Sequence, residues 1–221
     1  MRSAEQPGPT GRPFVRPYRP GDLPQVYDIC VRTADAGGDA RGLYSDDRLM
    51  GDLFAAPYVT LEPEHAFVLD DAGLAVGYVV GTADTARFVE RYRAEWIPAV
   101  AHRWPVPPVP PAESAPAVTP DEAMLALHHR PERMLVPELA GHPAHLHIDL
   151  LPAYQGRGFG RMLIQRLFTS LADAGVPAVH LGMAPANVAA RAFYERLGFT
   201  EISVPDAGSV TYLGRSTAPP V

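Results

Sequence analysis

The segment of residues 145–160, HLHIDLLPAYQGRGFG, contains residue types whose spacing could do chemistry. In a strand, His145, His147 and Asp149 lie on one face, and the apolar residues between them lie on the other. A central strand covered by helices on both faces is apolar throughout. Three titratable residues on one face therefore indicate that this face borders a cleft, where two imidazoles and a carboxylate could transfer protons.

Two other roles remain open for these side chains. The histidines could be hydrogen-bonded partners of neighbouring polar groups. Alternating residues on one strand could also share a metal ion. Because no further ligands are spaced to complete such a site, we predict that the chain binds no metal.

A proline-marked break at Pro152 and a turn containing Gly156, Gly158 and Gly160 follow this strand and open a helix. Such a turn leaves unpaired backbone N–H groups at the positive end of the helix dipole, where phosphate binds. The glycine spacing differs from the Gly-x-Gly-x-x-Gly of dinucleotide-binding folds, and the next strand, AVHLGM, ends without a ribose-binding carboxylate. A P-loop is excluded because the chain contains no lysine.

The glycine turn instead matches the Gln/Arg-x-x-Gly-x-Gly/Ala pattern of the GCN5-related N-acetyltransferases (GNAT) at Gln155, Gly158 and Gly160. A second element, NVAARAFYERLGF, places Asn187 and Tyr194 at the family's usual distance from the turn. The two motifs in this order and at this spacing resemble that superfamily strongly.

The resemblance covers roughly residues 143–214 and implies an enzyme that transfers acetyl from acetyl-CoA directly to an amine acceptor in a ternary complex. In this family the glycine turn and its arginines hold the pyrophosphate of coenzyme A, and free amides at the end of the preceding strand polarise the thioester. The implied coenzyme-binding residues are Leu150, Leu151, Gln155, Gly156, Arg157, Gly158, Phe159, Gly160, Arg161, Asn187 and Tyr194.

The resemblance also implies catalytic roles. Tyr194 matches the family's general acid, a phenol that protonates the departing thiolate, although an aromatic packing role is the alternative. We predict that Asp149, through a water and helped by His147, accepts the amine proton; a histidine or a water acting as the base stays open. The family often places its base near Ala144, which cannot serve. This departure supports a second hypothesis, a catalytically silent module that binds acetyl-CoA as a sensor or interaction domain.

A closer resemblance comes from HLHIDLL, FYERLGF, the terminal YLGRS and the segment AEWIP. Together they are similar to the acetyltransferase-like C-terminal domain of O-GlcNAcase and its bacterial stand-alone relatives. The animal domain is regarded as degenerate in its coenzyme loop, whereas this chain keeps QGRGFG. The resemblance therefore supports a coenzyme-binding member, and leaves a protein lysine, a small amine or an amino sugar as the acceptor.

The elements that position these residues follow from periodicity and turn chemistry. We expect strands at 13–19, 66–70, 74–83, 144–151, 177–183, 199–204 and 209–215, and helices at 20–34, 45–54, 83–104, 120–129, 158–175 and 188–198. Asp22 and Asn187 are expected N-caps, and Gly175 and Gly198 are expected to end helices. The order predicts an α/β (α+β) fold with a mixed, mostly antiparallel sheet of six or seven strands, flanked by helices, and a parallel splay at 145–151.

Residues 84–142 are expected to be a helical and proline-rich insertion that roofs the acceptor site of a single acetyltransferase domain, 1–221, with 1–12 as a disordered leader. A linker between two domains is the alternative. The proline-dense stretch WPVPPVPPAESAPAVTP should be an extended surface segment. Apolar residues of the insertion recur at helical spacing, at Phe88, Tyr92, Trp96 and Val100.

The bulk composition narrows the class of protein. A net charge of −6 argues against nucleic-acid binding. The start of the chain lacks an apolar core of a signal peptide, and no window resembles a membrane span, so we expect a cytoplasmic protein, a monomer or homodimer. The single cysteine, Cys30, is expected to be a buried small hydrophobe. All 19 basic residues are arginines, which is typical of a high-GC bacterium.

Overall fold

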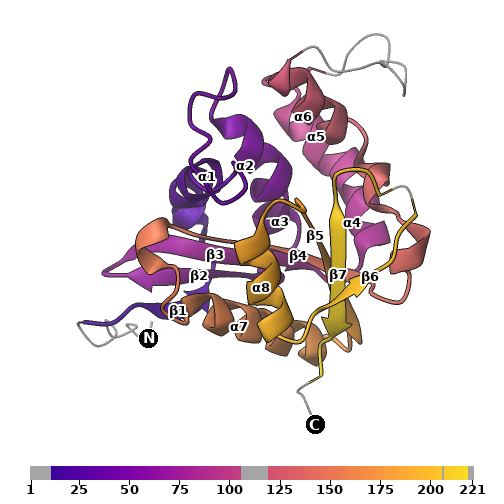
Figure 1. The fold of residues 1–221 in the computed structure, drawn as a ribbon. Coiled ribbons are helices and arrows are strands. Elements are labelled where there is room, and N and C mark those ends of the chain that lie inside the picture. The colour runs from indigo at the N-terminus through magenta and orange to yellow at the C-terminus, as the bar shows by residue number, and fades with distance from the viewer. Residues whose placement is uncertain (1–10, 106–118, 206, 219–221) are drawn as a thin grey trace, which may run out of the picture.

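A seven-stranded sheet in the order β1-β2-β3-β4-β5-β7-β6 forms the centre of the molecule (Figure 1). The structure is a computed structural model that describes residues 11–105, 119–205 and 207–218. The strands are β1 (Phe14–Pro17), β2 (Ala66–Asp71), β3 (Leu74–Thr82), β4 (Ala144–Leu150), β5 (Ala178–Met183), β6 (Thr200–Ile202) and β7 (Thr211–Ser216).

Every neighbouring pair of strands is antiparallel except β4 and β5, which are parallel. The predicted mixed, mostly antiparallel sheet is therefore confirmed, and an all-parallel sheet of the dinucleotide-binding type is excluded. The hairpin between β2 and β3 turns through Ala72 and Gly73, both at positive φ (53° and 90°), as a tight two-residue connection requires.

Helices cover both faces of the sheet. They are α1 (Leu23–Val31), α2 (Arg48–Phe54), α3 (Ala56–Leu61), α4 (Thr85–Arg91), α5 (Ile97–Val100), α6 (Pro120–His128), α7 (Phe159–Asp173) and α8 (Val188–Arg196). Helices α1 to α5 share one buried apolar cluster with Val68, Tyr78 and Val80 of the sheet. Helices α7 and α8 share a second cluster with Leu69 and Val79. Because both faces are covered, β3 is buried along almost its whole length.

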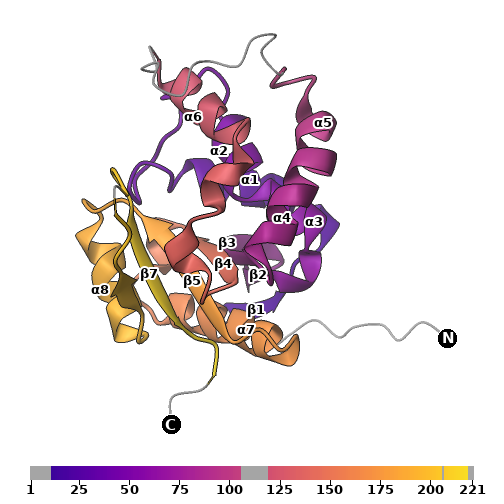
Figure 2. The ribbon, with the colours of Figure 1, turned by 90° about the vertical axis from the view of Figure 1, so that its right-hand side faces the viewer.

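The insertion departs from one continuous helix. Figure 2 shows α4 and α5 leading away from the sheet and α6 returning toward it. Between α4 and α5, Tyr92–Trp96 forms a π-helical turn. A strict four-residue repeat drifts by about 40° per step around an α-helix, and a wider π turn offsets this drift. The four repeated residues are consequently all buried: Phe88, Tyr92, Trp96 and Val100.

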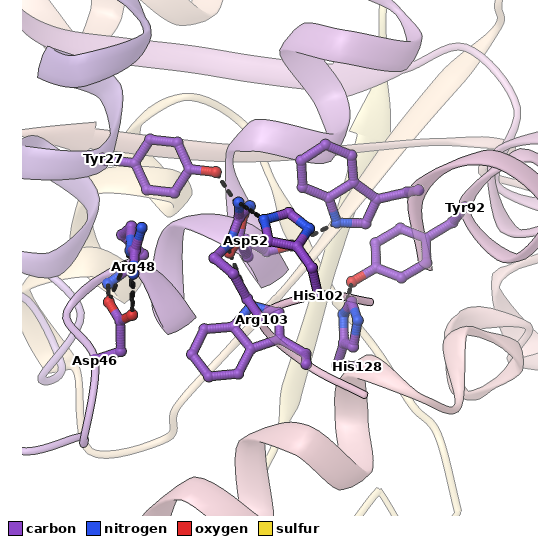
Figure 3. A network of polar contacts seen from close by, with 10 residues as sticks. Tyr27, Asp46, Arg48, Asp52, Tyr92, His102, Arg103 and His128 are labelled. Carbon is purple, nitrogen blue, oxygen red and sulfur yellow. Dashed lines mark hydrogen bonds and ion pairs between the residues drawn. The ribbon is translucent and has the colours of Figure 1, made fainter. Parts of the chain in front are cut away.

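A buried carboxylate ties the insertion to the first helices (Figure 3). Asp52 on α2 accepts hydrogen bonds from Arg103 Nε and Nη2, both at 2.9 Å, and from Trp104 Nε1 at 2.8 Å. The Tyr27 hydroxyl also donates to it. The Trp96 indole donates to the Asp52 carbonyl at 2.8 Å. These bonds join segments between 25 and 52 residues apart in the chain.

Some local predictions were wrong. Helix α3, entered through Pro57, was not predicted. Asp22 lies at the N-cap position of α1, but its side chain makes no capping bond; it instead holds Arg16, with Nη–Oδ distances of 2.7 and 2.8 Å. A paired buried arginine is a stronger partner for a carboxylate than a single backbone amide.

Other local predictions are confirmed. Gly175 and Gly198 follow α7 and α8 at positive φ, and Cys30 is buried and free. Most of the predicted leader and of the proline-dense stretch lies outside the described residues. Within the part of the chain that the structure describes, no helix has the length and apolar character needed to cross a membrane.

Candidate active site

Strands β4 and β5 diverge and open a wedge in the sheet. They pair only at Ala144 with Val179 and at His145 with His180. From Leu146 onward, β4 keeps its antiparallel partner β3 but has no pairing with β5. The predicted splay is therefore present, and beyond His145 the backbone groups of β4 that face β5 make no ladder bonds with it.

Backbone alternation decides which amides face this wedge. The Leu151 N–H donates to the Val76 carbonyl at 3.1 Å, so the Leu151 amide is already paired and the predicted free amide there is wrong. The backbone N–H and C=O of the preceding residue, Leu150, point away from β3, because the backbone groups of successive residues in an antiparallel strand face opposite sides. Gln155 Nε2 donates to the Leu150 carbonyl at 2.8 Å and ties the turn to this strand end.

The glycine turn leads directly into the N-terminus of α7. Gly156 and Gly158 adopt φ values of 70° and 85°, which glycine reaches without strain. Gly158 is the N-cap of α7 and no side chain caps the helix, so the first-turn N–H groups are open to an anion. Glycine at position 160 is explained by close packing and not by backbone conformation: a Cβ there would lie 3.0 Å from the ring of Phe193 on α8.

Two arginines flank these amides. Arg157 donates to the Ala153 carbonyl at 3.2 Å, and its guanidinium lies over the rings of Tyr154 and Phe159, at 5.8 and 5.2 Å from the centroids. Phe159 itself is buried and supports this stacking. Arg161 is exposed in the first turn of α7. The turn thus combines free amides and two cations, the groups that bind a pyrophosphate.

Asn187 lies at the N-terminus of α8, as predicted. Its side-chain oxygen accepts from the Ala190 N–H at 3.0 Å, which confirms the N-cap. The side-chain nitrogen of Asn187 lies near Gly37: a Cβ built on Gly37 would be 3.7 Å from this nitrogen. The loop after α1 therefore reaches the start of α8, beside the wedge.

Tyr194 on α8 is buried against the rings of Phe193 and Phe199, with centroids 5.2 and 5.5 Å away. Its hydroxyl makes no hydrogen bond with any described residue. Burial raises the pKa of Tyr194, and the charge of Asp149 raises it further. The structure therefore brings these two predicted residues close enough to interact, and Tyr194 is a neutral phenol at physiological pH.

Asp149 is partly buried on β4. Its Oδ2 accepts from the Tyr78 hydroxyl at 2.5 Å. Burial raises the pKa of Asp149, while hydrogen bonds from Tyr78 and Thr33 oppose this shift. A carboxylate with a raised pKa is a better base than a free one.

The two histidines of β4 meet at Tyr58 on α3. Tyr58 Oη lies 2.7 Å from His145 Nε2 and 3.1 Å from His147 Nε2. His145 is buried, and its Nδ1 lies 2.8 Å from Thr85 Oγ1, so both of its nitrogens are engaged. His147 is partly buried, and burial lowers its pKa to about 4. It is therefore a neutral imidazole at pH 7, with a proton on one ring nitrogen and a lone pair on the other.

Tyr58 was missed by the sequence analysis. It lies in APYVTL, a short apolar segment with no pattern that distinguishes it from core.

Among the described residues, no group of three or more His, Cys, Asp and Glu side chains is arranged to hold a metal. A hollow of about 1120 Å³ lies between α7, the end of α8 and β7. It includes Arg161 but none of the β4 side chains, and we assign it no chemistry.

The splay between β4 and β5, the uncapped glycine turn and the tyrosine on α8 are the features that the GNAT resemblance implies. The chain belongs to the GNAT acetyltransferase family, whose family model, "Acetyltransferase (GNAT) family", matches residues 122–199.

The relatives of this chain agree with that membership. The crystal structure of SsHAT is 62% identical, with a TM-score of 0.88, over 95% of this chain and 100% of that one. Protein O-GlcNAcase of Rattus norvegicus is 28% identical over 94% of this chain, which spans only 22% of that protein's length. The structure of yncA from Salmonella typhimurium with its cofactor acetyl-CoA, 16% identical over 96% of this chain and 97% of that one, has a TM-score of 0.53 and shows the same fold.

Proposed function

We propose that this protein transfers an acetyl group from acetyl-CoA directly to an amine acceptor. The observation that carries the proposal is the continuity of the site: the β4–β5 wedge opens onto the uncapped N-terminus of α7, with Asp149 and Tyr194 beside it. Acyl transfer from a thioester needs a held donor, a stabilised oxyanion, a base and an acid. Each need has a candidate group here.

The donor site has two parts. The amides of the turn at 155–161, with Arg157 and Arg161, would hold the pyrophosphate. The wedge would take the pantetheine arm, and the Leu150 N–H would donate to the thioester carbonyl as negative charge develops on it. Asn187, at the start of α8, would contact the coenzyme from the other side.

Proton transfer completes the reaction. A base on β4, Asp149 or His147, would take the proton that the amine nitrogen releases as the N–C bond forms. Tyr194 would give its proton to the sulfur as the C–S bond breaks. The raised pKa of Tyr194 keeps that proton available at neutral pH.

The insertion belongs to the acceptor side in this proposal. Its helices α4 and α5 share a core with α1 to α3. The same core contains Tyr58 and Tyr78, the hydrogen-bond partners of His147 and Asp149. Residues 84–142 would therefore roof the acceptor in a single domain. A protein lysine, a small amine and an amino sugar remain the candidate acceptors.

Calorimetry with acetyl-CoA, CoA and NAD tests the donor site. We expect the wild type to bind both coenzyme A species and not NAD. Gly158→Asp should abolish this binding, because it places a carboxylate at the pyrophosphate position and an L side chain at positive φ. Equal binding by the variant would contradict the proposed site. An acetyl-CoA consumption assay over a broad amine panel then tests transfer.

A catalytically silent acetyl-CoA-binding module is the second candidate. Ala144, at the position where the family often has its base, is fully buried and apolar, and both nitrogens of His145 are engaged. This hypothesis predicts the same calorimetry and no turnover of any amine. Turnover that depends on Tyr194 would exclude it.

A further inference from the structure

A chain of hydrogen bonds runs behind His147 into the protein. His147 Nε2 lies 3.1 Å from Tyr58 Oη, which lies 2.7 Å from His145 Nε2. His145 Nδ1 lies 2.8 Å from Thr85 Oγ1, and that hydroxyl donates to the Pro143 carbonyl at 2.8 Å. Four contacts thus connect a partly exposed imidazole to a backbone oxygen that can only accept.

The carbonyl at the end decides the direction of the donors. If Thr85 donates to Pro143, its oxygen must accept from His145 Nδ1–H. His145 Nε2 then carries a lone pair and accepts from the Tyr58 hydroxyl, whose oxygen accepts from His147 Nε2–H. All four contacts are hydrogen bonds in this direction.

The opposite direction is less favourable. If Thr85 donates to His145, the contact between Thr85 Oγ1 and the Pro143 oxygen has no proton, and one buried hydrogen bond is lost. Two buried oxygen atoms in contact without a proton between them are unfavourable. The reversed chain would also leave His147 with a proton on Nδ1, which has no acceptor among the described residues.

The chain therefore leaves the Nδ1 lone pair of His147 as its outer end. This nitrogen makes no hydrogen bond with a described residue. It is also not fully enclosed by protein, in contrast to the unpaired His128 Nε2. Two neighbouring groups act on the ring: Arg133, whose charge disfavours its protonation, and His180. Both favour the neutral imidazole, in which one ring nitrogen carries a lone pair.

We propose that His147 Nδ1 is the atom that takes the amine proton, and that Tyr58, His145 and Thr85 are positioning residues that hold His147 in the Nε2–H form. The inference rests on the proposed acetyl transfer. As the N–C bond forms and the C–S bond breaks, the amine proton moves to His147 Nδ1 and the Tyr194 proton moves to sulfur. Tyr58 accepts the His147 Nε2–H and so holds the imidazole in the tautomer that leaves the Nδ1 lone pair free.

The tautomers can be measured without any activity. In ¹⁵N-histidine-labelled wild type at neutral pH, we expect His147 to show an unprotonated Nδ1 and a protonated Nε2, and His145 to show the reverse. His147→Gln assigns the signals by their loss. Tyr58→Phe keeps the ring stacked on Phe88 at 4.4 Å and should give His147 mixed tautomers. A wild-type His147 protonated on Nδ1 would overturn the proposal.

Turnover provides the second measurement. Tyr58→Phe should lower kcat by about 10²-fold, the scale of an impaired general base, with the KM for acetyl-CoA unchanged. Tyr92→Phe is the matched control, because Tyr92 bonds a different buried histidine, His128, at 2.8 Å (Figure 3). It should keep the wild-type kcat. Equal kcat in Tyr58→Phe and wild type would overturn the proposal.

The two measurements separate this inference from the proposed function. If the wild type acetylates no amine, the proposed function fails, and the base role of His147 fails with it. The NMR result would still decide the direction of the hydrogen-bond chain. If the wild type is active but its tautomers are reversed, only the positioning inference is lost.

Discussion

Tyr194 on α8 and Asp149 on β4 affect each other's protonation. Burial raises the pKa of both groups, and the charge of Asp149 raises that of Tyr194 further. A phenol that stays protonated is a proton donor at neutral pH, whereas a carboxylate with a raised pKa holds a proton more readily. The same buried surroundings therefore keep the proton on Tyr194, which is the acid of the proposed transfer.

Removal of the Tyr194 hydroxyl tests the acid directly. Tyr194→Phe keeps the packing on Phe193 and Phe199 but has no proton to give. We expect turnover to fall by about 10²-fold or more, with little change in acetyl-CoA affinity. Steady-state kinetics and calorimetry on the same protein check this. Undiminished turnover would leave Tyr194 with a packing role only.

The N-terminus of α7 depends on two glycines at positive φ. No heavy atom lies within 4 Å of a Cβ placed on Gly156 or Gly158, so a substitution there meets backbone strain and no steric clash. The helix needs this conformation to leave its amides open, which links local backbone freedom to ligand binding.

Gly158→Ala tests this link at α7. The left-handed backbone costs an L residue about 1–2 kcal/mol. We therefore expect the free energy of unfolding to fall by about that amount, the Tm to fall with it, and acetyl-CoA binding to weaken. Gly141→Ala is the control, since a Cβ there also meets open space but the glycine has no positive φ. An unchanged Tm in Gly158→Ala would contradict the conformation of the turn.

The Asp52 carboxylate joins α1, α2 and the end of the α4–α5 segment. It is fully buried and accepts from Arg103, Trp104 and Tyr27. Asp52→Ala would leave these donors, including a charged guanidinium, without their acceptor. We expect a loss of about 3–5 kcal/mol in the free energy of unfolding, measured by denaturant titration.

Asp46→Ala is the matched control for Asp52→Ala (Figure 3). Asp46 also pairs with an arginine, Arg48, at 2.5 Å, but the arginine is more than half exposed. Surface pairs of this kind contribute about 0–1 kcal/mol. Similar losses in the two variants would contradict the anchoring role of Asp52.

Most histidines of the described chain are buried or partly buried. Burial lowers the pKa of seven of them: His65, His128, His129, His142, His145, His147 and His180. In the unfolded chain each returns to about 6.5. Below that pH the unfolded state binds more protons than the folded state, so stability is fully present above pH 6.5 and is lost as the pH falls toward the folded values.

We therefore expect the Tm to fall as the pH is lowered from 7 to 5. Each such histidine lowers the free energy of unfolding by up to about 1.4 kcal/mol per pH unit. Fully buried His128, whose pKa is lowered to about 4, allows a test. His128→Phe should reduce the slope of stability against pH. A flat Tm between pH 7 and 5 would contradict the burial of neutral imidazoles.

The sequence by itself determined the features that depend on neighbouring residues. The glycine turn, the Asn187 cap, the β2–β3 hairpin and the order of strands follow from local backbone preferences and alternation, which act over a few residues. The motif spacing at Gln155, Gly158 and Tyr194 carried the family resemblance for the same reason. Local rules failed at Asp22, whose carboxylate caps no amide of α1 and instead accepts from Arg16 of the preceding strand and from the Arg19 N–H.

Only the tertiary structure decided the contacts between distant segments. Tyr58 and His145 are separated by 87 residues, and Asp52 and Arg103 by 51, so no periodicity links either pair. The Leu151 amide is unavailable because β3 reaches it, which strand alternation in one segment cannot reveal. Hydrogen-bond partners in a core are chosen by which buried polar groups meet when the apolar faces pack, and that choice exists only in the folded chain.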